Sequence, residues 1–152
     1  MRRLPIEVRR IGALHLPQMR EALRVFADAF DEEETFFSAP PSDAYLDDLL
    51  SDDRFVLLTA SEGGRVIGAL SAYELRKYER ERSELYIYDL AVAETHRRRG
   101  AATALIEALR PIAREKKAWM IFVQADREDA PAVALYGKLG VEEQPLNFDI
   151  AP

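Results

Sequence analysis

The sequence places a short polar turn between an apolar run and a helix, and this turn contains three consecutive arginines. The apolar residues 90–92 are followed by residues 93–96 and then by Arg97, Arg98 and Arg99. A helix that begins here leaves its first N–H groups without internal partners, and its dipole places about half a positive charge at that end. Small residues allow an anion to approach the backbone, and arginines add mobile positive charge. This pattern predicts a pyrophosphate site formed by Arg97, Arg98, Arg99, Gly100, Ala101, Ala102 and Thr103. The spacing excludes a P-loop, which needs a lysine directly after its second glycine.

Composition limits the kind of protein that this chain can be. Its 152 residues, 48% hydrophobic and 32% charged, are typical of one soluble domain spanning residues 1–152. No apolar run is long enough to cross a membrane, so we expect a cytoplasmic protein without membrane contact. The absence of cysteine excludes disulfides and thiolate chemistry, and two distant histidines argue against a metal site. A net charge of −6 argues against nucleic acid as a partner.

The hydrophobic pattern predicts the order β-α-α-β-β-β-α-β-α-β, which is typical of an α/β fold with one mixed sheet flanked by helices. An acidic and aromatic loop is expected at residues 31–41, with Ser42 capping the helix that follows. Glycines at residues 63–64 predict a hairpin. Pro111 is expected to kink a helix or remove one of its hydrogen bonds. The strands are expected at residues 6–11, 55–60, 65–73, 85–92, 119–125 and 143–150, and the long helices at residues 17–30, 100–117 and 131–139.

Two motifs carry a family resemblance. The run Arg-Arg-Arg-Gly-Ala-Ala at residues 97–102 fits the Arg/Gln-x-x-Gly-x-Gly/Ala signature of the GNAT superfamily of N-acetyltransferases, and residues 132–140 resemble that family's later helix with its Leu-Tyr-x-Lys-x-Gly ending. Residues 86–92, 123–126 and 148–150 are similar to the aminoglycoside 3-N-acetyltransferases of the GNAT type. The resemblance covers nearly the whole chain and is closest from Ser83 onward.

The resemblance implies a GNAT fold and the transfer of acetyl from acetyl-CoA to an amine. The pantetheine arm would pair with the strand edge at Leu90, Ala91 and Val92, as in β-augmentation. A main-chain amide near Val92 would stabilise the charge that develops on the thioester oxygen. Tyr136 occupies the position of the family's proton donor to the leaving thiolate, although a tyrosine on such a helix could also belong to the core. Asp129 stands where many relatives carry an asparagine that contacts the cofactor arm, and it could cap its helix instead.

The amine acceptor needs a base and carboxylates, and four acidic residues are candidates. Strand alternation puts Glu84 on one face with Tyr86 and Tyr88, and Asp89 on the opposite face unless a bulge redirects it. Glu84, directly or through water, is the preferred base. Asp126 and Asp149 lie at or near strand ends and could bind ammonium groups or share the base role. Each of Glu84, Asp89, Asp126 and Asp149 could also be a structural carboxylate.

Three functions fit these features. The first is an aminoglycoside 3-N-acetyltransferase that confers antibiotic resistance, which suits the acidic surface because these drugs are polycations. The second is a GNAT enzyme for another amine, such as a polyamine or a protein amine. The third is a module that binds acetyl-CoA without catalysis. The resemblance also implies a homodimer that pairs through C-terminal strands.

Overall fold

The computed structural model describes residues 3–152 and contains one five-stranded sheet in the order β1-β2-β3-β4-β5. The first four strands are antiparallel neighbours, and β5 runs parallel to β4. The strands are β1 (Ile6–Ile11), β2 (Phe55–Glu62), β3 (Arg65–Arg76), β4 (Ser83–Val92) and β5 (Ala118–Val123). The helices are α1 (Leu16–Phe30), α2 (Glu33–Phe37), α3 (Asp43–Ser51), α4 (Ala101–Glu115) and α5 (Ala130–Leu139). This mixed α/β architecture confirms the fold class expected from the sequence.

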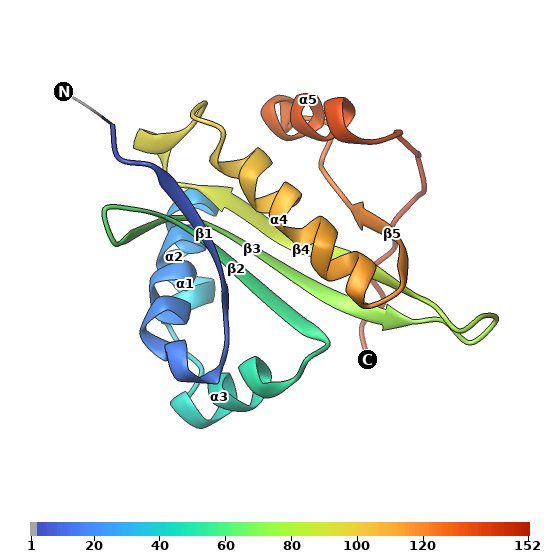
Figure 1. The fold of residues 1–152 in the computed structure, drawn as a ribbon, viewed down its shortest axis with the longest axis horizontal. Coiled ribbons are helices and arrows are strands. Elements are labelled where there is room, and N and C mark those ends of the chain that lie inside the picture. Colours follow the sequence, from blue (N-terminus) through green and yellow to red (C-terminus); the bar gives the residue numbers. More distant parts are fainter. Residues whose placement is uncertain (1–2) are drawn as a thin grey trace.

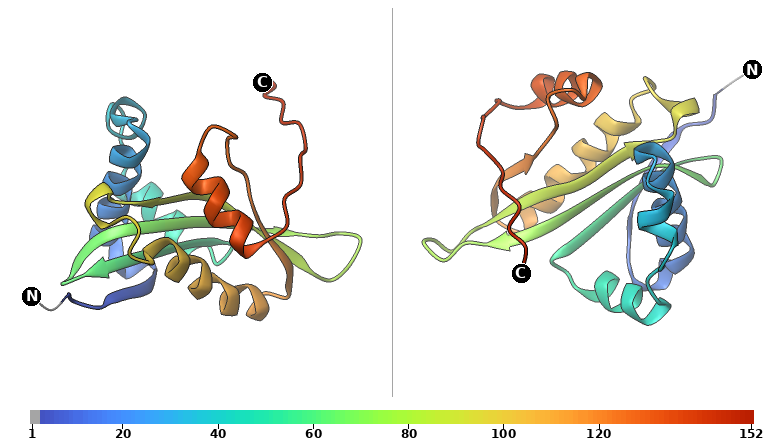
Figure 2. Two further views of the ribbon diagram at one scale, coloured as in Figure 1. Left: turned by 90° about the horizontal axis from the view of Figure 1, so that it is seen from above. Right: turned by 180° about the vertical axis from the view of Figure 1, so that it is seen from behind.

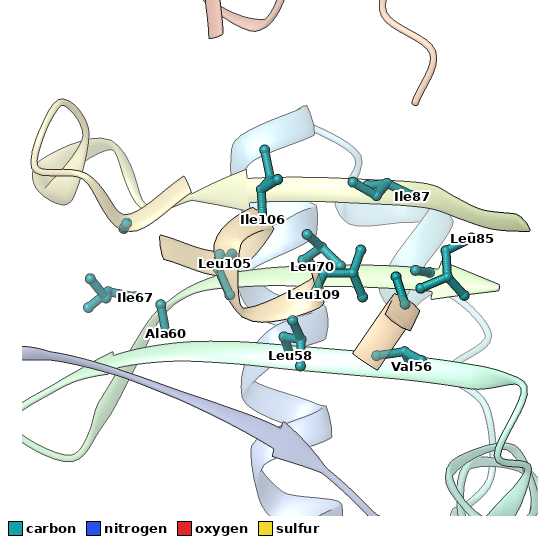
Figure 3. Close-up of a cluster of buried hydrophobic side chains, with 13 residues drawn as sticks. Val56, Leu58, Ala60, Ile67, Leu70, Leu85, Ile87, Leu105, Ile106 and Leu109 are labelled. Atoms are coloured by element: carbon teal, nitrogen blue, oxygen red, sulfur yellow. The ribbon is translucent and has the colours of Figure 1, made fainter. Parts of the chain in front are cut away.

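Helices cover the two faces of the sheet, with α4 on one side and α1 and α2 on the other (Figures 1 and 2). The α4 side contains a core cluster in which Leu105 and Leu109 lie among buried residues of β2, β3 and β4, including Leu58, Leu70 and Leu85 (Figure 3). A second cluster joins α1 and α3 to the opposite face, and its members include Met19, Phe26, Leu46, Phe55 and Leu57. Burying each large side chain contributes about 1.5–3 kcal/mol, so both layers are held to the sheet along their length.

Several local signals act as the sequence predicts. The side chain of Ser42 accepts a hydrogen bond from the N–H of Tyr45 at 3.1 Å and caps α3. The β2–β3 hairpin turns on Gly63 and Gly64, whose φ angles of 58° and 80° are accessible to glycine without strain. α4 runs through Pro111 without a break, so the proline removes one N–H donor but does not end the helix.

Two parts of the predicted element order are wrong. Residues 31–41 contain the short helix α2, which the mixture of acidic and aromatic residues concealed. The strand expected at residues 143–150 does not form. Leu146, Phe148 and Ile150 do alternate with polar residues, but a strand also needs a neighbour to pair with, and this segment is exposed along its whole length. It extends from the body on the side of the sheet that carries α1 (Figure 2).

Candidate active site

The sheet opens between β4 and β5. Their parallel pairing runs from Ser83 opposite Ala118 to Ile87 opposite Val123, and β4 then continues to Val92 without a β5 partner. The N–H of Ala93 donates to the carbonyl of Ile67 on the β3 side at 2.7 Å. Because successive N–H groups of a strand point to opposite edges, those of Leu90 and Val92 face the edge that β5 has left. This edge can pair with an extended, amide-containing ligand.

The turn after β4 ends in a helix start suited to an anion. A 3₁₀ turn at Glu94–His96 leads into the arginines, where Arg98 has a φ of 59° and Gly100 a φ of 84°. Gly100 is the N-cap of α4, and the first helical bond runs from the N–H of Ala104 to its carbonyl at 2.9 Å. The N–H groups at the first turn therefore have no intrahelical acceptor and can donate to phosphate oxygens.

The three arginines of this turn do different things. Arg97 donates from Nε to the carbonyl of Val92 at 3.2 Å, which places its guanidinium at the open edge of β4. The side chain of Arg98 is exposed. Arg99 turns away and forms a bidentate ion pair with Glu62 at the end of β2. The positive charge of the turn is thus distributed around the start of α4. Of these three arginines, Arg99 is the one that forms an ion pair with a carboxylate.

Tyr136 lies on α5 and packs against the α4-side core. Burial, with a smaller effect from the charge of Asp129, raises the pKa of Tyr136 to about 12. The phenol therefore stays protonated across the physiological range and is available as a hydrogen-bond donor. Asp129 caps α5 by accepting from the N–H of Ala132 at 3.2 Å, as one of the two sequence-based alternatives expected.

A β-bulge changes the direction of the residues in β4. Ser71 of β3 is opposite Asp89, and the next β3 residue is opposite Ile87, so Tyr88 has no partner. Ile87 belongs to the α4-side core, whereas Ala91 belongs to the α1-side core, although simple alternation would place both on one face. Simple alternation would point Asp89 away from Tyr86, but the bulge that the sequence analysis allowed for is present and brings Asp89 to the α1 side.

Asp89 lies in a partly buried, negatively charged environment on that face. Its N–H donates to the Ser71 hydroxyl at 3.2 Å. Burial, and then the charge of Glu32, raise the pKa of its carboxyl above the ordinary value. Glu32 comes from the start of α2 and was not singled out in the sequence, although it belongs to the acidic run at residues 31–34. A carboxylate with a raised pKa is a better proton acceptor than an ordinary aspartate.

Aromatic side chains line the sheet on the same face as Asp89. Tyr88 makes edge-on contacts with Tyr73 and Tyr86, with ring centroids 5.8 Å apart in both pairs. Tyr86 stacks on Phe122 of β5 at 4.7 Å, and Tyr73 lies 5.3 Å from Phe55 of β2. Burial first, and then Tyr88 and Asp89, raise the pKa of Tyr86. The surface beside Asp89 thus combines a carboxylate with aromatic rings, a combination that suits organic cations.

The other acidic candidates lie elsewhere. Glu84 is near the beginning of β4, where it accepts from the indole of Trp119 at 3.1 Å and lies 3.6 Å from the ammonium group of Lys77. At about 3.4 Å per residue, roughly 27 Å of strand separates Glu84 from Val92, which is too far for direct proton transfer at that amide. Asp126 is exposed in the turn between β5 and α5, and Asp149 is exposed on the C-terminal segment. The structure thus brings Asp89 to the open end of β4 but does not bring Glu84 there.

Two absences hold for residues 3–152, which the structure describes. In this part of the chain, no group of three or more histidine, aspartate or glutamate side chains is placed to hold a metal ion. No helix within the same residues is both long and apolar enough to cross a membrane.

The sheet opens between two parallel strands, and the N-terminus of α4 lies beside the opening, an arrangement suited to an extended, anionic cofactor. The chain belongs to the acetyltransferase (GNAT) family, whose model matches residues 19–141. This family uses acetyl-CoA as its acetyl donor. The match includes both the arginine turn and α5.

Solved structures extend the similarity over almost the whole chain. An aminoglycoside acetyltransferase from an uncultured soil metagenomic sample is 49% identical, with a TM-score of 0.95 over 98% of this chain and 99% of that one. A second aminoglycoside acetyltransferase from such a sample, solved in complex with sisomicin, is 29% identical, with a TM-score of 0.90 over 97% of this chain and 96% of that one.

Curated relatives match shorter stretches. An uncharacterized N-acetyltransferase of Bacillus subtilis (strain 168) is 42% identical over 52 residues, which are 34% of this chain and 21% of that protein. The chain spans less than half the length of the curated relatives that it matches.

Proposed function

We propose that this chain transfers the acetyl group of acetyl-CoA to the 3-amino group of aminoglycoside antibiotics. The observation that carries this proposal is the similarity, along 98% of the chain, to a protein described as an aminoglycoside acetyltransferase. The open edge of β4 supports the cofactor part of the proposal, and the carboxylate and aromatic surface around Asp89 supports a cationic acceptor. The choice of the 3-amino group rests on the sequence resemblance at residues 86–92, 123–126 and 148–150.

The cofactor would lie along β4 and end at the start of α4. The edge of Leu90, Ala91 and Val92 offers backbone donors and acceptors to the amide-containing arm. The pyrophosphate would accept from the turn and the first helical residues, and the exposed arginines would neutralise its charge. The residues proposed for this phosphate site are Arg97, Arg98, Arg99, Gly100, Ala101, Ala102 and Thr103, and Arg99 would contribute through its backbone because its side chain is paired with Glu62. Asp129 keeps α5 in place beside the arm through its cap, and Tyr136 is the α5 residue proposed to contact the thioester.

The proposed reaction is a direct transfer. Acetyl-CoA supplies an activated acetyl thioester, and the acceptor supplies a neutral amine. The amine nitrogen forms a bond to the acetyl carbon, the carbon–sulfur bond breaks, and the thiolate gains a proton as the amine loses one. The N–H of Val92 donates to the carbonyl oxygen as negative charge develops there. Tyr136 donates its proton to the sulfur as the carbon–sulfur bond breaks and regains a proton from water. Because its pKa is raised to about 12, the phenol is protonated when the reaction begins.

We assign the base role to Asp89 in preference to Glu84. Asp89 is partly buried and has a raised pKa. It lies on β4 directly after the bulge at Tyr88 and directly before Leu90, where the unpaired edge proposed for the cofactor begins. Glu84 is already engaged by Lys77 and Trp119 at the other end of the strand. Asp89 would accept the proton of the attacking amine, directly or through water. Glu32 would add negative charge that attracts the remaining ammonium groups of the acceptor.

We further propose that two copies of the chain associate through the C-terminal segment. Leu146, Phe148 and Ile150 are 81%, 75% and 89% exposed, respectively, and their alternation is typical of a strand that lacks its partner. A second copy would cover these side chains. Asp149 and Asp126, exposed in one copy, would then contribute carboxylates to the acceptor region. Sedimentation of wild type and of Phe148→Asp tests this proposal: a dimer that becomes a monomer supports it, and a wild-type monomer overturns it.

The experiment that tests the function is a panel of acceptors. Purified protein is incubated with acetyl-CoA and gentamicin, spermidine or a lysine peptide, and thiol release is followed. Turnover with gentamicin supports the proposal. Turnover only with spermidine or the peptide redirects it to another amine, and cofactor binding without turnover indicates a non-catalytic module. Expression in a susceptible host, with the minimum inhibitory concentration of gentamicin as readout, tests whether the activity confers resistance.

A further inference from the structure

We propose that Glu62 is a positioning residue for acetyl-CoA. From the β2–β3 hairpin it holds Arg99 and His96, fixes the arginine turn, and keeps the Arg99 side chain from acting as a direct phosphate ligand. This inference rests on the proposed function, because it assumes that the turn binds the pyrophosphate of the cofactor.

Glu62 connects the two ends of the arginine turn, His96 and Arg99, and we call this set of contacts the brace. The Glu62 carboxylate accepts from both terminal nitrogens of Arg99, and it lies 3.2 Å from Nε2 of His96. The other ring nitrogen of His96 lies 2.8 Å from the hydroxyl of Thr95. One carboxylate thus holds the residues on both sides of the pair Arg97–Arg98.

Of the two residues between His96 and Arg99, Arg98 is the one whose backbone conformation needs support. Arg98 has a φ of 59°, in the left-handed region that residues with a Cβ adopt only at a cost. A brace that fixes both ends of the segment keeps this conformation in place, and the N–H groups that follow then stay directed towards the anion site. Without the contacts of Glu62, the turn would relax to another conformation. Phosphate binding would then have to order the turn again, which lowers the affinity.

The charges of Glu62 and Arg99 predict that the two substitutions will not act independently on cofactor binding, as they would if Arg99 contacted phosphate directly. The Glu62 and Arg99 side chains are only 16% and 19% exposed, and the hydrogen bond from Arg99, more than the charge of His96, lowers the pKa of Glu62. Glu62 is therefore ionised beside an anion-binding turn, and Arg99 neutralises it. If Arg99 is removed, an unpaired carboxylate remains close to the pyrophosphate site and repels it.

The test is a double-mutant cycle with coenzyme A binding measured by calorimetry, alongside KM and kcat for acetyl-CoA. We expect Arg99→Gln to weaken coenzyme A binding about tenfold and Glu62→Gln about threefold, with the losses in KM rather than in kcat. The double variant should bind better than Arg99→Gln alone, because the unpaired carboxylate is gone. Arg99→Lys, which keeps the pair, should retain affinity to within about threefold.

A control variant and two contrary outcomes complete the experiment. Arg54→Gln removes an ion-paired arginine at the other end of β2 and should leave coenzyme A binding unchanged. A double variant that binds no better than Arg99→Gln would show that Arg99 contacts phosphate directly, and Glu62→Gln with wild-type affinity would show that no brace is needed. If the wild type itself fails to bind coenzyme A, the proposed function fails instead. The thermal midpoint of each variant separates loss of binding from loss of fold.

Discussion

Ile87 lies opposite Val123 in the parallel pairing of β4 with β5, and this is the last pair before the two strands separate. The next residue along β4 is Tyr88, which the bulge leaves without a partner on β3. The loss of pairing on one edge and the bulge on the other therefore fall at the same point. As a result, the backbone edge proposed for the cofactor and the carboxylate proposed for the amine belong to the same short segment of one strand.

Gly100→Ala should weaken cofactor binding through backbone strain and not through steric clash. Gly100 has a φ of 84°, but a Cβ built on it meets nothing within 4 Å. An L-residue in this conformation costs about 1 kcal/mol, and the turn would relax to avoid it. We expect the KM for acetyl-CoA to rise about fivefold to tenfold, with a small loss of stability. Gly12→Ala, at a glycine with equally open space and no positive φ, is the control and should leave KM unchanged.

Asp89→Asn should remove the proposed base. We expect kcat to fall by about 100- to 1000-fold, with Asp48→Asn on the exposed side of α3 as the matched control. Because Asp89 acts in its ionised form and its pKa is raised, wild-type activity should increase with pH through a range above that of an ordinary aspartate. The measurement is the pH profile of thiol release. An Asp89→Asn enzyme with near-normal turnover would return the base role to another group.

The same substitution should increase stability at neutral pH. A carboxyl whose folded pKa is raised contributes stability that is fully present below its unfolded pKa and is lost as the pH rises through the folded pKa. Wild type at pH 7 therefore carries a partly buried charge next to Glu32, which asparagine removes. Thermal unfolding should show Asp89→Asn above wild type at pH 7, with the difference disappearing as the pH falls below about 4. A lower melting temperature at pH 7 would contradict the burial of an unneutralised charge.

The contrast between Asp89 and the C-terminal segment shows what the sequence could predict. Local signals placed the first five strands, the long helices, the Ser42 and Asp129 caps and the start of α4 after the arginines, because each depends on residues close in the chain. The bulge at Tyr88 could not be placed, since it is a property of how β4 registers against β3. The positions of Glu32 and Glu62 could not be predicted because these residues come from the start of α2 and from the β2–β3 hairpin, far from β4 in the sequence. The strand at residues 143–150 was predicted from alternation alone. Alternation indicates which side chains would share a face of a sheet, but it does not supply a neighbouring strand to pair with.

Tyr136→Phe should slow the transfer without preventing cofactor binding. We expect kcat to fall about 10- to 100-fold while the KM for acetyl-CoA changes less than about threefold, because the phenol acts on the leaving sulfur. With a pKa of about 12, Tyr136 stays protonated, so kcat should show no loss from its ionisation up to about pH 10. Tyr78→Phe, at a fully exposed tyrosine, is the control. Unchanged turnover in Tyr136→Phe would falsify the donor role.

The measurement that tests the central proposal most directly is the position of the acetyl group on the product. Gentamicin is converted with acetyl-CoA, the product is purified, and two-dimensional NMR identifies the acetylated nitrogen. A single product acetylated at the 3-amino group is the predicted result. Acetylation at a different amine, or no acetylated gentamicin from a protein that binds coenzyme A, would contradict it.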